Sequence, residues 1–128
     1  MKFIIQTSNA PAALGPYSQA VKTGNIVYLS GQIPMDPHTL SLVSPDFRVQ
    51  VETVFRYLRA VSEAAGGNLD AIVKLTIYLT DLANFPIVNE VMKRFFREPY
   101  PARSTVQISA LPKAALIEVD AVMCLDSQ

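Results

Sequence analysis

The decapeptide at residues 71–80, AIVKLTIYLT, constrains the fold more than any other segment because its side chains alternate strictly. Apolar side chains recur at every second position: Val73, Leu75, Ile77 and Leu79. Polar or mixed side chains fill the positions between them: Lys74, Thr76, Tyr78 and Thr80. Because successive side chains of a strand point to opposite faces, the pattern predicts a strand with one face on a core. The second face is too apolar to stay exposed and too polar for a monomer core, which is typical of a sheet face used for subunit packing.

An amphipathic helix is predicted from Pro45 to the Gly-Gly pair at 66–67, because apolar side chains between Phe47 and Ala65 recur at steps of three and four. We expect the helix to begin with Ser44 as its N-cap and Pro45 at the first helical position. The Gly-Gly pair at residues 66–67 is expected to end it. One apolar stripe on this helix can cover the apolar face of the predicted strand.

The rest of the chain supplies a second helix and further strands. The second helix is expected from about Asn84, and strands are expected at 25–30, 102–108 and 115–125. Two short extended pieces precede them, so the order is β-β-β-α-β-α-β-β. This order predicts a single α+β domain over residues 1–128, in which a mixed sheet carries both helices on one face.

Composition and charge exclude several classes of function. Half of the 128 residues are hydrophobic and 17% are charged, and this apolar surplus favours a homo-oligomer over a monomer with an unusually large core. Eleven basic and eleven acidic residues cancel, which argues against nucleic acid or a membrane surface as partner. Cys124 and His38 are each the only residue of their type, so an intrachain disulfide and a zinc finger are excluded. We expect His38 to be exposed and Cys124 to be a core or edge residue, not a nucleophile.

No apolar run in the sequence approaches the roughly 20 residues of a membrane-spanning helix. The apolar stretch near the N-terminus is too short for a signal peptide. We therefore expect a soluble cytoplasmic protein.

Arg103 opens the strand at 102–108 and is the residue that the strand pattern explains least. Alternation places one set of side chains on the face that we expect to lie away from the helices: Arg103, Thr105 and Gln107. The set with the apolar pair is expected to meet the helices: Ser104, Val106 and Ile108. Glu118 in the last strand is also expected to face away from the helices. If the two strands are neighbours, Arg103 and Glu118 converge where arginine can bind a carboxylate and glutamate can orient or deprotonate water.

Each of these residues also has a purely structural interpretation. On pattern alone, a salt bridge between Arg103 and Glu118 is the commoner outcome. Tyr17 could pack its ring in a turn, and Ser30 could simply end a strand. Asn89 lies off the apolar stripe of the second helix and could be solvated.

Four segments of the sequence carry a resemblance to a known family. They are NAPAALGPYSQAV (9–21), LSGQIPMDP (29–37), EAAGGNLDAIVKLTIYLTDLANFPIVN (63–89) and PARSTVQISALPKAALIEVDAV (101–122). In this order they resemble the Rid family of reactive intermediate deaminases, also called YjgF, over nearly the whole chain. The subgroup most similar to the sequence is RidA.

The resemblance implies a homotrimer of chorismate-mutase-like subunits, with the sheets forming a central barrel and the active sites in clefts between subunits. It implies hydrolysis of 2-iminopropanoate, 2-iminobutanoate and the enamine 2-aminoacrylate to 2-keto acids and ammonia. No cofactor and no metal ion is expected for this reaction. The expected partner is therefore a small 2-imino acid, beside the other copies of the chain.

The resemblance also implies roles for individual residues. Arg103 of the PAR motif holds the substrate carboxylate, and Glu118 of the IE motif places the attacking water. Five further residues match positions that bind substrate in the family: Tyr17, Ser30, Gly31, Asn89 and Thr105. Thr105 stands where many relatives carry a cysteine, and we expect it to be dispensable for the chemical step.

The sequence departs from the family pattern at two places. The loop HTLSLV (38–43) lacks the glycine usual there, and Tyr57 replaces a common asparagine, which could change helix packing.

Two other functions are alternatives to the deaminase. One is a catalytically silent protein that binds a metabolite or a regulatory partner, and the retention of Arg103 and Glu118 argues against it. The other is a nuclease or translation inhibitor, against which the absence of a basic stripe argues, since phosphate binding requires positive charge.

Overall fold

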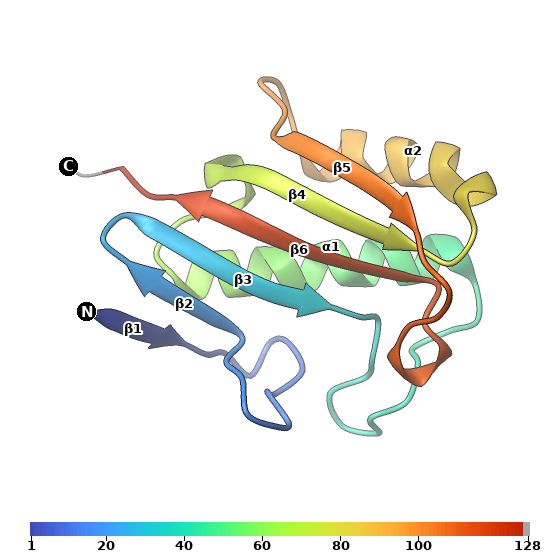
Figure 1. Cartoon of the computed structure of the whole chain (residues 1–128), viewed down its shortest axis with the longest axis horizontal. Coiled ribbons are helices and arrows are strands. Elements are labelled where there is room, and N and C mark those ends of the chain that lie inside the picture. Colours follow the sequence, from blue (N-terminus) through green and yellow to red (C-terminus); the bar gives the residue numbers. More distant parts are fainter. Residues whose placement is uncertain (127–128) are drawn as a thin grey trace.

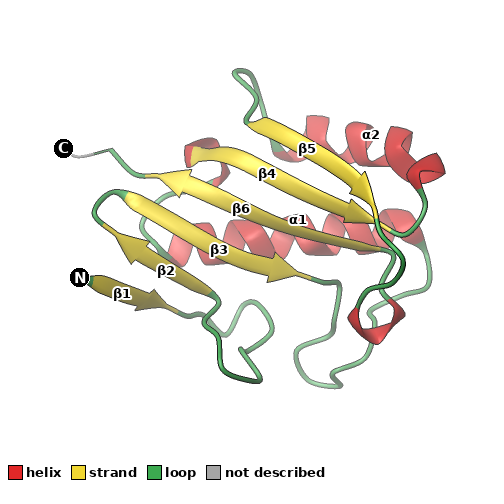
Figure 2. Ribbon diagram, viewed as in Figure 1, coloured by secondary structure: helices red, strands yellow, loops and turns green. Residues whose placement is uncertain are grey.

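Six strands form one mixed sheet in the order β1-β2-β3-β6-β4-β5 (Figures 1 and 2). They span β1 Lys2–Ile5, β2 Ala20–Thr23, β3 Ile26–Gln32, β4 Ile72–Leu79, β5 Ala102–Gln107 and β6 Ile117–Cys124. Neighbouring strands are antiparallel except β4 and β5, which are parallel. The structure is a computed structural model that describes residues 1–126. The predicted order of strands and helices is confirmed.

Two helices connect the strands and cover one face of the sheet. Helix α1 (Phe47–Ala64) joins β3 to β4, and α2 (Phe85–Phe95) joins β4 to its parallel neighbour β5. Parallel neighbours require such a crossover, because a tight turn can only reverse the chain direction. Both helices lie behind the sheet in Figure 1, which leaves its front face open. This confirms a single α+β domain with a mixed sheet and both helices on one face.

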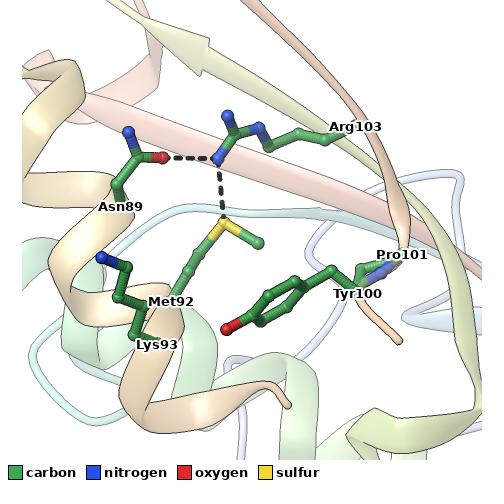
Figure 3. A pocket seen from close by; sticks show the side chains of 6 residues that line it. All are labelled: Asn89, Met92, Lys93, Tyr100, Pro101 and Arg103. Atoms are coloured by element: carbon green, nitrogen blue, oxygen red, sulfur yellow. Dashed lines mark hydrogen bonds between the residues drawn. The ribbon is translucent and has the colours of Figure 1, made fainter. Parts of the chain in front are cut away.

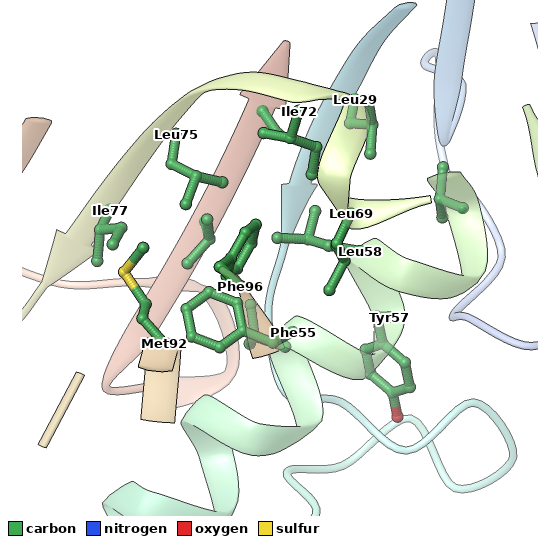
Figure 4. Close-up of a cluster of buried hydrophobic side chains, with 14 of the residues drawn as sticks. Leu29, Phe55, Tyr57, Leu58, Leu69, Ile72, Leu75, Ile77, Met92 and Phe96 are labelled. Carbon is green, nitrogen blue, oxygen red and sulfur yellow. The ribbon is translucent and has the colours of Figure 1, made fainter. Parts of the chain in front are cut away.

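The core fills the space between the sheet and the helices (Figure 4). The predicted apolar face of β6 is buried along its whole length: Ile117, Val119, Ala121 and Met123. Phe55 of α1 is fully buried, and its ring centroid lies 5.6 Å from that of Phe95 and 5.5 Å from that of Phe96. No helix within residues 1–126 is long and apolar enough to cross a membrane.

Val73 is the exception to the predicted alternation of β4. Its side chain is 49% exposed, whereas the preceding Ile72 is buried. The pairing of β4 with β6 shifts register between Ile72 and Lys74. A bulge of this kind adds one residue to a strand and reverses the face of the side chains before it. From Leu75 onward, the alternation follows the prediction.

Helix α1 begins two residues later than predicted, because Asp46 and not Ser44 is its N-cap. The Asp46 carboxylate accepts a hydrogen bond from the backbone N–H of Val49 at 3.0 Å. Ser44 Oγ instead accepts one from the backbone N–H of Asp46 at 3.0 Å. Pro45 therefore precedes the helix. The aspartate has the better geometry for a cap because its oxygen reaches one of the helix's unpaired N–H groups.

Both departures from the family pattern affect the loop before α1. Leu40 has a φ of 62°, a left-handed conformation that favours glycine, so a glycine in this loop would relieve backbone strain. The buried Tyr57 of α1 donates its hydroxyl to the carbonyl of Met35 at 2.8 Å. The tyrosine therefore anchors this loop to α1. At the other end of the helix, Gly66 has a φ of 99° and ends it as predicted.

Replacing Asp46 with alanine is expected to lower the free energy of unfolding by about 1 kcal/mol, because the N–H of Val49 loses its acceptor. Ser44→Ala is the control and is expected to cost less, since its hydrogen bond lies outside the helix. Urea unfolding at one fixed protein concentration compares the variants. A larger loss in Ser44→Ala would show that the serine is the effective cap.

Candidate active site

Arg103 lies on the edge strand β5, and its side chain points to the helix face of the sheet. In register with it on β4 is Leu75, which is buried against the helices. One guanidinium nitrogen, Nη1, donates to Asn89 Oδ1 at 2.7 Å and to Met92 Sδ at 3.4 Å. The ring of Phe85 stacks on the guanidinium, with 4.8 Å between its centroid and Cζ.

The three side chains that hold Arg103 lie on one stripe of α2: Phe85, Asn89 and Met92. Their spacing of four and three residues places them on the same helix face. Together they fix one nitrogen and one face of the guanidinium. Within residues 1–126, neither Nε nor Nη2 of Arg103 forms a hydrogen bond or an ion pair. A two-donor edge is therefore free, and this edge matches the two oxygens of a carboxylate.

A cavity of about 440 Å³ opens beside this guanidinium (Figure 3). Six residues line it: Asn89, Met92, Lys93, Tyr100, Pro101 and Arg103. Figure 3 shows Arg103 and Tyr100 on opposite sides of the cavity, with Met92 between them. The volume falls in the range of small-molecule sites, which is about 300–1,000 Å³.

Glu118 lies on the opposite face of the sheet from Arg103. It is paired with Tyr78 of β4, whose neighbours Ile77 and Leu79 are fully buried against the helices. Alternation therefore directs Tyr78 and Glu118 away from the helices. Arg103 and Glu118 of one chain do not converge, and they form no salt bridge. The predicted convergence and the predicted structural salt bridge are both wrong within one chain.

The prediction required β5 and β6 to be neighbours, but β4 lies between them. The predicted faces of β5 are also wrong. Its side chains alternate as expected, but Arg103 and Thr105 face the helices, whereas Ser104 and Val106 face away. Ser104 accepts a hydrogen bond from Lys74 on the outer face at 2.8 Å. An apolar pair usually marks the core side of a strand, but β5 is an edge strand. The polar face of this strand therefore meets an asparagine of α2 and the cavity beside that helix, and does not meet the core.

Gly31 of β3 lies directly against the Glu118 side chain. A Cβ atom at this position would lie 2.7 Å from Glu118 Cδ and closer still to Oε2. Real side chains do not approach so closely, so only glycine leaves room for the carboxylate. The pairing of β3 with β6 shifts register between Leu29 and Gln32, which brackets this contact. The irregular pairing and the glycine together accommodate Glu118.

Ser30 and Tyr17 belong to the same neighbourhood as Gly31. Ser30 Oγ donates to the carbonyl of Ser18 at 2.5 Å, and the Ser30 backbone N–H donates to the carbonyl of Gln19 at 2.9 Å. These bonds hold the loop that carries Tyr17 against β3. Tyr17 itself is 55% exposed, so its ring is available to a ligand or to another subunit.

Burial raises the pKa of Glu118, and the charge of nearby Asp120 raises it further. Asp120 also accepts a hydrogen bond from the Tyr78 hydroxyl at 2.9 Å, and this bond raises the pKa of Tyr78. A carboxylate with a raised pKa takes up a proton more readily near neutral pH. Glu118 is therefore suited to accept a proton from water and to return it.

The residues predicted from the sequence thus divide into two groups. The helix-face group consists of Asn89, Arg103 and Thr105. The open-face group consists of Tyr17, Ser30, Gly31 and Glu118. The Thr105 hydroxyl is buried, and it has no hydrogen-bond partner among the residues described. No cluster of three or more His, Cys, Asp or Glu side chains in this part of the chain could hold a metal ion.

Sequence analysis missed most of the lining of the Arg103 cavity, which consists of Met92, Lys93, Tyr100 and Pro101. It also missed Phe85, whose ring stacks on the Arg103 guanidinium. The spacing of Phe85, Asn89 and Met92 is a signal for part of it, because residues four and three apart share one helix face. The sequence analysis places Asn89 off the apolar stripe of this helix and does not use that spacing. Tyr100 and Pro101 lie in an irregular segment, where no periodicity shows which way a side chain points.

Comparison with known proteins agrees with this architecture. Residues 7–124 match the family model described as endoribonuclease L-PSP, the domain of the Rid (YjgF) proteins. The chain belongs to the Rid family. A 2-iminobutanoate/2-iminopropanoate deaminase of Dermatophagoides farinae is 44% identical to this Rid-family chain over 125 residues, which is 98% of each sequence.

Solved structures of the family superimpose closely on this chain. RidA from the Antarctic bacterium Psychrobacter sp. gives a TM-score of 0.92 at 49% identity, covering 96% of this chain and 99% of that one. E. coli TdcF with bound serine gives a TM-score of 0.90 at 40% identity, covering 97% and 99%.

Gly31→Ala is expected to lower the pKa of Glu118 toward its ordinary value, because the added methyl group must displace the carboxylate toward water. Carbon-13 NMR of labelled glutamate side chains measures the titration. Gly24→Ala is the control, since a methyl group there contacts nothing within 4 Å. Its φ of 57° should lower the stability of this variant but leave the Glu118 carboxylate in place. An unchanged Glu118 pKa in folded Gly31→Ala protein would contradict the assigned cause.

Proposed function

We propose that this Rid-family chain hydrolyses 2-imino acids and their enamine tautomers to 2-keto acids and ammonia. The expected substrates are 2-aminoacrylate, 2-iminopropanoate and 2-iminobutanoate. The observation that carries the proposal is the free two-donor edge of Arg103, held in place by Asn89 and Phe85 beside a ligand-sized cavity. The deaminase relative at 44% identity supports the same chemistry.

We further propose that the chain acts as a homotrimer, in which Arg103 of one subunit meets Glu118 of the next. The opposite placement of the two residues in one chain supports an intersubunit site. Exposed apolar side chains, among them Tyr28 at 54%, lie along the sheet and its edges and support its use in packing. A chorismate-mutase-like trimer would enclose the open faces of three sheets in a central barrel.

The reaction needs positioning and one proton acceptor. Arg103 would hold the substrate carboxylate, and Glu118 would remove a proton from the water that attacks C2. As the new C–O bond forms, the electron pair of the C=N bond moves to nitrogen, which takes up a proton. The hydroxyl of this adduct then gives its proton to nitrogen as the C–N bond breaks, which releases ammonia and leaves the 2-keto acid. An imine carbon is already electrophilic, so positioning and charge complementarity suffice without a cofactor.

The remaining predicted residues would complete this site. Gly31 would leave space for the Glu118 carboxylate because it has no Cβ atom, and Ser30 would hold the loop that carries Tyr17. Tyr17 would close the pocket with its ring. Thr105, two residues from Arg103 on the same face, would contact substrate through its unpartnered hydroxyl and would not act as a nucleophile.

The family description names an endoribonuclease, and this activity is the less favoured alternative. The chain has a formal net charge of zero. Binding to an RNA backbone depends on clustered positive charge, because counterions are released from the phosphates. The guanidinium of Arg103 and the carboxylate of Glu118 instead fit a small anionic substrate.

Arg103→Lys is expected to reduce kcat/KM for 2-iminopropanoate by about 10- to 100-fold, because an ammonium group cannot replace a planar two-donor fork. Arg103→Ala should lose detectable acceleration. The assay generates 2-aminoacrylate with a serine dehydratase and times pyruvate release. Melting temperatures of the same preparations separate lost chemistry from lost folding. Stable Arg103→Ala protein with full activity would end the assignment.

Glu118→Gln is expected to slow turnover by about 10²–10⁴-fold, because the amide cannot accept a proton from water. In the unmodified protein, activity should fall as the pH drops through the raised pKa of Glu118, since protonation removes the base. A kcat profile without an acid limb would contradict Glu118 as the base. An acid limb that Glu118→Gln leaves unchanged would belong to another group.

A mixing experiment tests the intersubunit site. Arg103→Ala and Glu118→Gln chains, unfolded together and refolded at equal ratio, form trimers in which some interfaces join an intact Arg103 to an intact Glu118. Random assembly should restore about a quarter of the wild-type activity. Light scattering should give about three times the 14.0 kDa chain mass. A mixture as inactive as its parents, in confirmed mixed trimers, would place both residues of each site in one chain.

A further inference from the structure

The cavity beside Arg103 has a second polar end that the proposed reaction does not use. Arg103 and Asn89 form one end, where the substrate carboxylate would bind. Tyr100 lines the other part of the cavity, Met92 lies between Tyr100 and Arg103, and the Lys93 side chain runs along α2 at the side of the cavity (Figure 3). The thioether of Met92 supplies an apolar floor. An anion-binding end, an apolar floor and a second polar end follow one another along the cavity.

The charge in this cavity is not neutralised by the protein. Both ionised residues in its lining, Arg103 and Lys93, are cations, and no acidic residue lines it. The neighbouring Arg94 forms an ion pair with Glu52, whereas Lys93 forms none within residues 1–126. Two cations that share a cavity without a counterion complement a ligand with two negative charges.

The free hydroxyl of Tyr100 adds a hydrogen-bond donor at the second end. No hydrogen bond to this hydroxyl is formed among the residues described, and Figure 3 shows it directed toward α2 near the Lys93 side chain. Figure 3 draws the Lys93 ammonium farther along α2, on the side of Asn89, so this flexible side chain must turn toward Tyr100 for both groups to donate to a single carboxylate. The cavity of about 440 Å³ also offers more space than a three-carbon substrate fills.

We propose that this site selects 2-imino dicarboxylates of four or five carbons, with Lys93 and Tyr100 as the residues that determine this specificity. The proposal rests on the imine hydrolysis proposed above. Arg103 holds the carboxylate next to the imine carbon, the chain of the substrate crosses Met92, and Lys93 and Tyr100 bind the distal carboxylate.

The chemistry of the step is that of the smaller imines. The oxygen of water bonds to C2 and becomes the keto oxygen, both bonds of the C=N group break, and ammonia leaves with both protons that water gave up. Both carboxylates are unchanged. Imines of this class arise when the α-amine of an acidic amino acid is oxidised, with the two electrons taken up by the oxidising enzyme. Such an oxidation is the class of reaction that would supply the substrate.

The test compares two imines that differ in charge but scarcely in shape, those of glutamate and glutamine. Amino-acid oxidases generate them in place, and semicarbazide traps whatever imine remains. The wild-type kcat/KM should favour the glutamate imine, and Lys93→Met should reduce this ratio by roughly 10-fold. Tyr100→Phe should reduce it less, because only a neutral donor is lost. The ratio cancels differences in the amount of folded protein.

Lys2→Met is the matched control, because it also removes one exposed positive charge. Lys2 lies on β1, at the opposite edge of the sheet from β5, so the ratio should stay at the wild-type value. Added salt should lower the wild-type preference, since screening weakens the second charge contact.

Two results would overturn the inference while leaving imine hydrolysis standing. One is a wild-type protein that hydrolyses 2-iminopropanoate but does not favour the glutamate imine over the glutamine imine. The other is a preference that Lys93→Met leaves intact or that Lys2→Met lowers equally. Failure on every imine, including 2-iminopropanoate, would instead remove the proposed function itself.

Discussion

The parallel pairing of β5 with β4 is the constraint on which the candidate site depends. It sets Arg103 in register with Leu75 and therefore turns the arginine toward α2. The same crossover helix that makes parallel pairing possible then holds the guanidinium through Asn89, Met92 and Phe85. A shift of one residue in this pairing would turn Arg103 to the other face and empty the cavity of its cation.

Strand pairing also sets the position of Glu118 on the face of the sheet that lies away from the helices. Antiparallel pairing of β6 with β4 turns Glu118 away from the helices, and the irregular pairing with β3 brings Gly31 beneath its carboxylate. Burial there raises the pKa of Glu118 and prepares it for proton transfer. The chain thus places Arg103, the proposed anion-binding group, and Glu118, the proposed proton acceptor, on opposite faces of one sheet. Assembly of subunits is the physical means proposed to join them.

Several sequence-based predictions needed no tertiary information. Strand alternation identified the buried face of β6, and apolar steps of three and four identified α1 and its covered face. Other predictions failed where a neighbour decided the outcome. The N-cap of α1 is Asp46 and not the predicted Ser44, because the aspartate side chain reaches the backbone N–H of Val49. Val73 points outward and not toward the core, because a bulge in β4 reverses its face.

The sequence by itself determined the element order, the apolar faces and the polar residues that are candidates for catalysis or binding. These features depend only on residue type and local periodicity. Only the tertiary structure decided that Arg103 faces α2 and that Glu118 lies on the other face. It also decided that Lys93 and Tyr100 share the Arg103 cavity. Strand order and the packing of α2 set these relations between residues distant in sequence, and alternation within one strand carries no information about which face a helix will cover.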